Sequence, residues 1–186
     1  EELWLECQTC KQRFFGDVKL QLAHARWERA RNRAEGDDER LEAANVLAHA
    51  LHSNGGREAA VPLYEEVLRA VRRKSGGDNN EDAFSLMMSL AITHREMDNP
   101  QKALPLVEEA LRGRRTLLGD GEDTMAALDL LGSVHYDMEE YGAALPLAQE
   151  ALDVRRRLHG HVHQSTLQSI NLLSLIHSAM GNTAAA

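Results

Sequence analysis

Apolar residues recur along most of the chain at the spacing of an α-helix, and the pattern itself repeats. Within residues 46–51, 86–92 and 128–134 they fall three or four positions apart, as on one face of a helix. After each stretch comes a second one that shares a nearly constant phrase, at residues 60–68, 103–111 and 144–152. The prolines in these phrases, Pro62, Pro105 and Pro146, are 43 and 41 residues apart. The pattern predicts an all-α solenoid of helical hairpins with a period of about 42 residues.

The repeat extends beyond the prolines and sets the domain organisation. A glycine follows each proline by fourteen residues, at Gly76, Gly119 and Gly160, where it suits the left-handed end of a helix. We expect repeats at about 38–80, 81–122 and 123–163, and a partial fourth repeat over 164–186 whose second helix is cut off near its start. Small residues keep a fixed phase, which predicts close helix approach at Ala48, Ala91, Gly132 and Ser174 on the first helices and at Ala60, Ala103 and Ala144 on the second.

The first 37 residues do not follow the repeat. Residues 17–37 carry Leu20, Ala23 and Trp27 on one helical face, which predicts a helix that caps the first repeat. Residues 1–16 hold both cysteines, Cys7 and Cys10, separated by two residues. This spacing fits two reduced thiols, half of a zinc site that needs two more ligands, or a redox pair.

Composition and charge narrow the function. The net charge of −8 argues against sequence-independent nucleic-acid binding, which requires a basic surface. No apolar run reaches the eighteen or so residues of a membrane span, so we expect a cytoplasmic protein. Arginine clusters at residues 72–74, 112–115 and 155–157 fall near the ends of the second helices, where exposed cations complement the helix dipole; a site for an acidic partner is the less favoured alternative.

Several motifs resemble those of a known family. The phrase Ala-Leu-Pro-Leu-x-Glu-Glu-Ala-Leu-x-x-Arg-Arg, with Asn45-Val-Leu-Ala48 and Gly-x-x-His163-x-x-Thr166, is similar to the tetratricopeptide repeats of the kinesin light chain type, over about residues 38–186. The resemblance implies a groove that binds peptides. The asparagine typical of that groove is present at Asn45 and Asn171, whereas Met88 and Asp129 replace it in the middle repeats. The Cys7-Gln-Thr-Cys10 segment resembles the closing half of a RING-type zinc finger, with Gln8 in the place of a proline.

The helical phase locates the expected groove on the first helix of each repeat. Residues stepping by four and then three positions share one face of a helix, and stacking turns these faces into a concave strip. The candidate peptide-binding residues are Asn45, His49, His52, Met88, Ile92, Arg95, Asp129, Ser133, Tyr136, Asn171, Leu175 and Ser178. The expected ligand is a peptide with an apolar anchor and an acidic residue that pairs with Arg95.

We expect no enzymatic activity. The chain contains no nucleophile elbow, phosphate-binding glycine loop, HExxH motif or dinucleotide fingerprint. His94, His135 and His177 recur once per repeat, too far apart to share one metal ion, so they are predicted to serve packing or the groove edge. No cofactor is expected, apart from zinc at Cys7 and Cys10.

The sequence therefore predicts a non-catalytic scaffold or adaptor that binds a partner protein, within a larger complex or alone. Two alternatives stay open. The chain is the substrate-binding arm of a RING-type ubiquitin ligase, or it is an architectural subunit of a large assembly that uses its outer helical faces.

Overall fold

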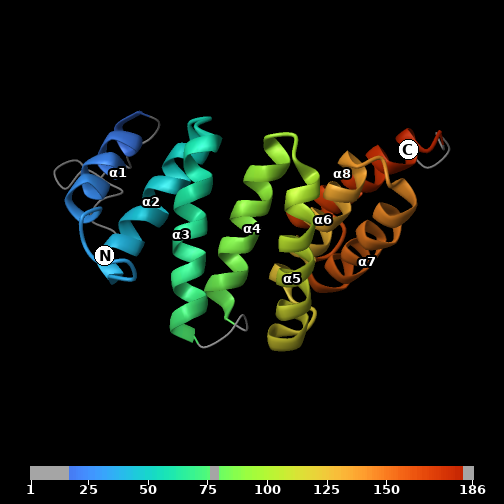
Figure 1. Ribbon diagram of the computed structural model, residues 1–186. Coiled ribbons are helices and arrows are strands. Elements are labelled where there is room, and N and C mark those ends of the chain that lie inside the picture. Colours follow the sequence, from blue (N-terminus) through green and yellow to red (C-terminus); the bar gives the residue numbers. More distant parts are fainter. Residues whose placement is uncertain (1–16, 76–79, 182–186) are drawn as a thin grey trace. The chain divides into compact units, whose positions relative to one another are not determined.

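The computed structural model describes residues 17–75 and 80–181, and within them every regular element is an α-helix. The predicted all-α, helical-hairpin fold is confirmed. The elements are α1 (Asp17–Ala30), α2 (Asp38–Ser53), α3 (Arg57–Ser75), α4 (Glu81–Glu96), α5 (Pro100–Leu118), α6 (Glu122–Asp137), α7 (Tyr141–His159) and α8 (Gln164–Ala179) (Figure 1). The first helices of the repeats have 16 residues each and the second helices 19, so helix length is constant from repeat to repeat.

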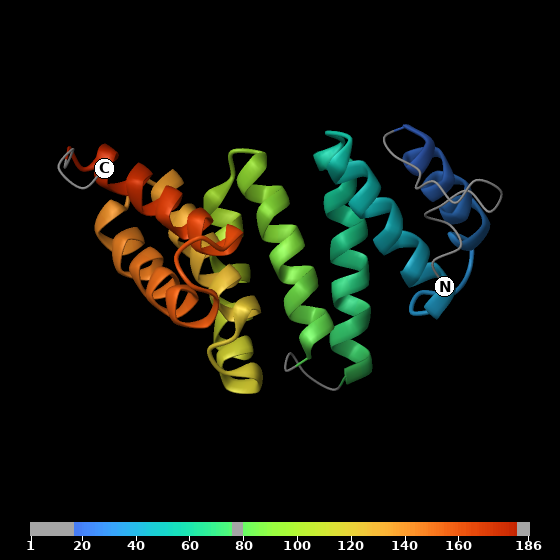
Figure 2. The same cartoon turned by 180° about the vertical axis from the view of Figure 1, so that it is seen from behind.

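The chain forms two compact units, which are described separately. The first ends at Gly77 and the second begins at Asp78. In the first unit α1 packs on α2, and α2 packs on α3. In the second unit α4 pairs with α5 and α6 with α7, and α6 also contacts both α4 and α8. Figure 2 shows α8 on the near side, beside α7 and α6.

Helix ends follow the local sequence. The Asp37 side chain accepts a hydrogen bond from the Arg40 amide at 3.1 Å, and Asn80 caps α4 in the same way through the Asp82 amide at 2.8 Å. At the other end of the second helices, Gly119 and Gly160 have φ values of 68° and 82°, which favour glycine as predicted, but their ψ values of −152° and −177° lie outside the left-handed helical region. Gly76 lies outside the described residues.

Close approach within a hairpin occurs at the predicted small residues. A Cβ on Gly132 of α6 would lie 3.5 Å from the carbonyl oxygen of Ala144 and 3.7 Å from the Cβ of Leu147, both on α7. Ala91 on α4 and Ala103 on α5 are fully buried at the corresponding positions of the preceding hairpin. A larger side chain at either site would push the two helices apart.

The α4–α5 hairpin contains a contact that the sequence did not indicate. The ring of Phe84 is buried against Gly113 in the middle of α5, where an added Cβ would lie 2.0 Å from the ring Cζ atom. Glycine lowers the stability of a helix interior, so its presence here is explained by the space that the ring occupies.

In the first unit a buried tyrosine joins two helices. Tyr64 of α3 is 1% exposed, and its hydroxyl lies 2.9 Å from Nδ1 of His49 on α2, with the two rings edge to face. Burial raises the pKa of Tyr64 to about 12. Desolvation of the ring, with the nearby charges of His52 and Lys19, lowers the pKa of His49 below its ordinary value. The neutral form of both groups is therefore favoured in the folded state.

We predict that Gly113→Ala lowers the free energy of unfolding by about 1–3 kcal/mol, because the methyl group overlaps the Phe84 ring in a packed core. The measurement is urea unfolding followed by circular dichroism. Gly142→Ala on α7 is the matched control, since no atom lies within 4 Å of its added Cβ; it should be neutral or slightly stabilising. Adding Phe84→Leu to Gly113→Ala should recover part of the loss. Strictly additive effects of the two changes would contradict this packing account.

We also predict that the His49 site makes stability pH-dependent. Because the folded state lowers its pKa, the unfolded chain binds the proton more tightly, and stability is lost as the pH falls below the ordinary value of 6.5 towards the lowered one. Urea midpoints measured from pH 8 to pH 5 should fall more steeply for the wild type than for His49→Gln. Identical pH profiles for the two proteins would show that the His49 proton does not contribute.

Candidate functional site

The second unit contains a cavity of about 490 Å³ on the face formed by its first helices. Side chains from α4, α6 and α8 line it, so three successive repeats contribute to one site. This volume lies in the range of pockets that bind ligands of moderate size. The lining residues are Ile92, Arg95, Asp129, Leu130, Ser133, Tyr136, Gln168, Asn171, Leu172 and Leu175.

Most residues of the expected groove in this unit lie together in the cavity. Seven predicted residues line it, and the other two of this unit do not: Met88 is buried, and Ser178 is exposed outside the lining. Leu130, Gln168 and Leu172 were missed. Leu130 and Leu172 each directly follow a predicted residue, and Gln168 lies one helical turn before Asn171. A wider helical face would have included all three.

The predicted residues of the first unit are all on α2, at Asn45, His49 and His52. The His49 side chain is exposed on one side, while its Nδ1 is engaged by Tyr64. The Oδ1 atom of Asn45 is buried and has no hydrogen-bond partner among the described residues. An unsatisfied buried acceptor has a free-energy cost, and the burial of this atom keeps it from solvent.

Asp129 forms the polar floor of the cavity and is tied to a buried arginine. Arg155, near the end of α7, pairs with the Asp129 carboxylate and donates to Ser169 Oγ at 2.8 Å and to the Ser165 carbonyl at 3.1 Å. Its second terminal nitrogen lies 2.9 Å from Glu122. Burial raises the pKa of Asp129, while Arg155 and Ser169 oppose that effect. The carboxylate is thus already compensated from within the fold.

Arg95, the basic residue of the cavity, also has a partner. Its Nε atom lies 2.5 Å from the Asp137 carboxylate on α6, and both side chains are about one-third exposed. The prediction that Arg95 is open to a carboxylate therefore needs refinement, since an acidic ligand must compete with Asp137. The remaining polar groups, on Ser133, Tyr136, Gln168 and Asn171, are neutral.

The sequence suggested that the arginine clusters at the ends of the second helices are exposed. In the structure, two of these arginines are buried. Arg155 is 2% exposed and Arg114 is 6% exposed. Arg114 donates to the Asp123 carbonyl at 2.9 Å, and burial lowers its pKa. One arginine of each of these two clusters therefore holds the following first helix in place, whereas the neighbouring arginines are exposed, and one of them, Arg115, pairs with Glu150.

The structure offers no support for a metal site within its described residues, where no group of three or more His, Cys, Asp or Glu side chains could hold an ion. His135 Nδ1 lies 2.7 Å from the Glu140 carboxylate, and the ring of His159 stacks on that of His163. Cys7 and Cys10 lie outside the described residues. Zinc binding there, and the ligase alternative that depends on it, remain predictions.

Among the described residues, no helix has both the length and the apolar character that crossing a membrane requires. The predicted cytoplasmic location is not tested by this finding.

Comparison with solved structures identifies similar folds. BtubC (BKLC) from P. vanneervenii has a TM-score of 0.75 and 21% identity, over 89% of this chain and 66% of that one, so this chain spans just under two thirds of BtubC. The nearly identical TPR-like repeats of a kinesin light chain from Podosopora anserina give 0.74 over 89% of this chain and 79% of that one. A variant of the same repeats gives 0.75 over 89% and 78%, and both share 20% identity with this chain. At this identity the likeness concerns the fold alone.

A search of curated proteins by sequence gave no match. The family model described as tetratricopeptide repeat matches residues 39–116 and 123–186, which is most of the chain. Such repeats generally serve as protein–protein interaction scaffolds and are typically non-catalytic. Because the family model matches most of its residues, the chain belongs to the tetratricopeptide repeat family.

Proposed function

We propose that the second unit binds a peptide segment of a partner protein in the 490 Å³ cavity, and that the chain acts as a non-catalytic adaptor. The observation that carries the proposal is the convergence of three first helices on one cavity with both apolar and neutral polar walls. A scaffold that binds in this way needs no cofactor.

The walls suit an extended peptide. The side-chain amides of Gln168 and Asn171 can each donate and accept hydrogen bonds, as the backbone of a bound peptide requires. Leu175 is 45% exposed and lines the cavity together with Ile92, which provides apolar surface for side chains of the ligand. Tyr136 adds an aromatic face with a polar tip, a residue type often found at binding hot spots.

The Arg95–Asp137 pair would act as a filter for charge. A carboxylate on the peptide can pair with the Arg95 guanidinium only by displacing Asp137. The affinity for acidic peptides is therefore lower than it would be if Arg95 were unpaired. A neutral peptide leaves the pair intact. An acidic residue in the peptide, as expected from the sequence, therefore only adjusts the affinity. Binding itself depends on the hydrogen bonds of the amides and on the apolar contacts.

We predict that the Tyr136→Ala, Asn171→Ala double variant binds peptides at least about tenfold more weakly. Removing two central side chains of a binding cavity commonly costs about 2 kcal/mol or more, which is about thirtyfold in affinity. The probe is a library of displayed short peptides selected on the wild-type chain, with affinities measured by fluorescence anisotropy. Arg112→Ala on exposed α5 surface is the control and should leave affinity unchanged. Selected peptides that bind all three proteins equally would refute the groove proposal.

A second prediction concerns the charge filter. Asp137→Asn should increase the affinity of acidic peptides several-fold, because it frees the Arg95 guanidinium, and should leave neutral peptides unaffected. Arg95→Ala should weaken the acidic peptides. The comparison uses pairs of selected peptides that differ by one Glu-to-Gln change. If Asp137→Asn strengthens both members of each pair equally, Arg95 does not contact the peptide charge.

A further inference from the structure

The helix α8 begins with a histidine cap. His163 directly precedes its first turn, and the Nδ1 atom accepts a hydrogen bond from the Ser165 amide at 3.3 Å and lies 2.8 Å from the Ser165 hydroxyl. Because an amide nitrogen can only donate, this Nδ1 atom carries no proton in the folded chain. The cap therefore depends on the neutral form of the ring, and histidine is the side chain that ordinarily changes its charge between about pH 5 and pH 8.

The other side-chain caps found in the described residues do not share this property. Asp37 caps α2 and Asn80 caps α4. An asparagine side chain does not titrate, and the hydrogen bond from the Arg40 amide holds the pKa of Asp37 below its ordinary value. Among these three caps, only that of α8 loses its acceptor on mild acidification.

Protonation of His163 would also bring positive charges together. Its ring stacks on that of His159, at the end of α7, with the ring centroids 4.5 Å apart. The Glu122 carboxylate of α6 is engaged by two other groups, His159 Nε2 at 3.1 Å and Arg155 at 2.9 Å. A proton on His163 thus places a cation at the positive end of the α8 dipole and against the His159 ring. Protonation therefore destabilises the start of α8.

The first two turns of α8 carry part of the cavity in which the peptide is proposed to bind. Gln168 lines that cavity and follows His163 by five residues, which is about 8 Å along a helix. Ser169, next to it, donates to the Asp129 carboxylate of the cavity floor at 3.1 Å and accepts from Arg155 at 2.8 Å. Fraying of these turns would displace a wall and the floor of the cavity together.

We propose that His163 is a pH-sensitive latch on this cavity. In its neutral form the side chain caps α8 and keeps Gln168 and Ser169 in place, and the peptide binds. On acidification the ring gains a proton, the cap is lost, the first turns of α8 fray, and the peptide binds more weakly. This regulation rests on the proposed peptide function, because it acts on the same cavity.

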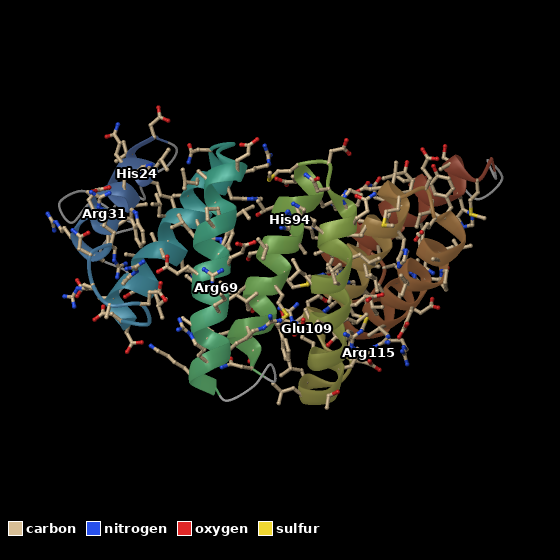
Figure 3. The ribbon with its side chains drawn as sticks, in the orientation of Figure 1. His24, Arg31, Arg69, His94, Glu109 and Arg115 are labelled. Atoms are coloured by element: carbon tan, nitrogen blue, oxygen red, sulfur yellow. The ribbon has the colours of Figure 1, made fainter. Side chains whose placement is uncertain are left out.

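Other groups of this unit also titrate, but their positions differ. His94 lies in the last turn of α4, towards its upper end in Figure 3, and His135 lies in the last turn of α6 beside Glu140. Neither caps the start of a helix. Asp129 is closer to the ligand, and burial raises the pKa of its carboxyl group. An experiment on the latch must therefore separate His163 from Asp129.

The affinity for peptides at two pH values tests the latch. The probes are peptides selected on the wild-type chain that contain no Asp, Glu or His and are capped at both ends, and fluorescence anisotropy measures their affinity. The wild type should bind about threefold to tenfold more weakly at pH 5.5 than at pH 7.5, as expected when a helix loses its cap. His163→Asn should bind equally at both, because asparagine caps a helix without titrating. His161→Asn, at an exposed histidine of the same loop, is the matched control and should keep the wild-type pH dependence.

A second measurement needs no peptide. In NMR spectra of the whole chain, the Ser165 amide of the wild type should shift and lose hydrogen-exchange protection between pH 7.5 and pH 5.5, whereas in His163→Asn it should do neither. Circular dichroism checks that both proteins stay folded at pH 5.5. Absence of peptide binding at both pH values would refute the proposed function and the latch with it, whatever the Ser165 amide does. Equal wild-type affinity at both pH values would refute the latch alone.

Three further outcomes would overturn the proposal. An equal loss of affinity in the wild type and in His163→Asn would assign the pH dependence to Asp129 or another group. A Ser165 amide that does not respond to pH in the wild type would show that the cap is kept on acidification. Loss of the pH dependence in His161→Asn would assign it to the wrong histidine of the loop.

Discussion

Two helices can lie side by side only as closely as the side chains between them permit, and the hairpins of this protein depend on that limit. Gly132 on α6 lies against the backbone of α7. In the preceding hairpin the equivalent positions are occupied by Ala91 and Ala103, which are fully buried. Because the contact is made by main chain and small side chains, the first helix of each hairpin is held firmly, and its other face can be used for recognition.

The periodic features of the fold were predictable from sequence, because each recurs. The proline phrase, the glycines at the helix ends and the small residues indicated the hairpins and their register, and the structure has helices of constant length at those places. Seven of the nine groove residues predicted in the second unit lie around one cavity for the same reason. Met88 was predicted because of its helical phase, but phase alone does not distinguish the groove from the core behind it.

What the sequence did not indicate are contacts that occur once. The pairing of Arg155 with Asp129 joins residues 26 positions apart on different helices, and Arg95 meets Asp137 at a separation of 42. Charge patterns along a helix suggested exposed cations, yet one arginine in each of two clusters is buried. Long-range ion pairs depend on which side chain turns inward, and neither spacing nor composition determines that choice. Both pairs change the chemistry of the cavity, because they leave its free polar groups neutral.

The contact of Phe84 with Gly113 has a consequence for how such a chain can change. At the equivalent positions the next hairpin carries Met125 and Val154. A recombination that joined α4 to α7 would place the valine against the phenylalanine ring, where even one added carbon has no room. The hairpin, rather than the single helix, is therefore the smallest piece of this chain that can be duplicated, exchanged or grafted without repacking its core.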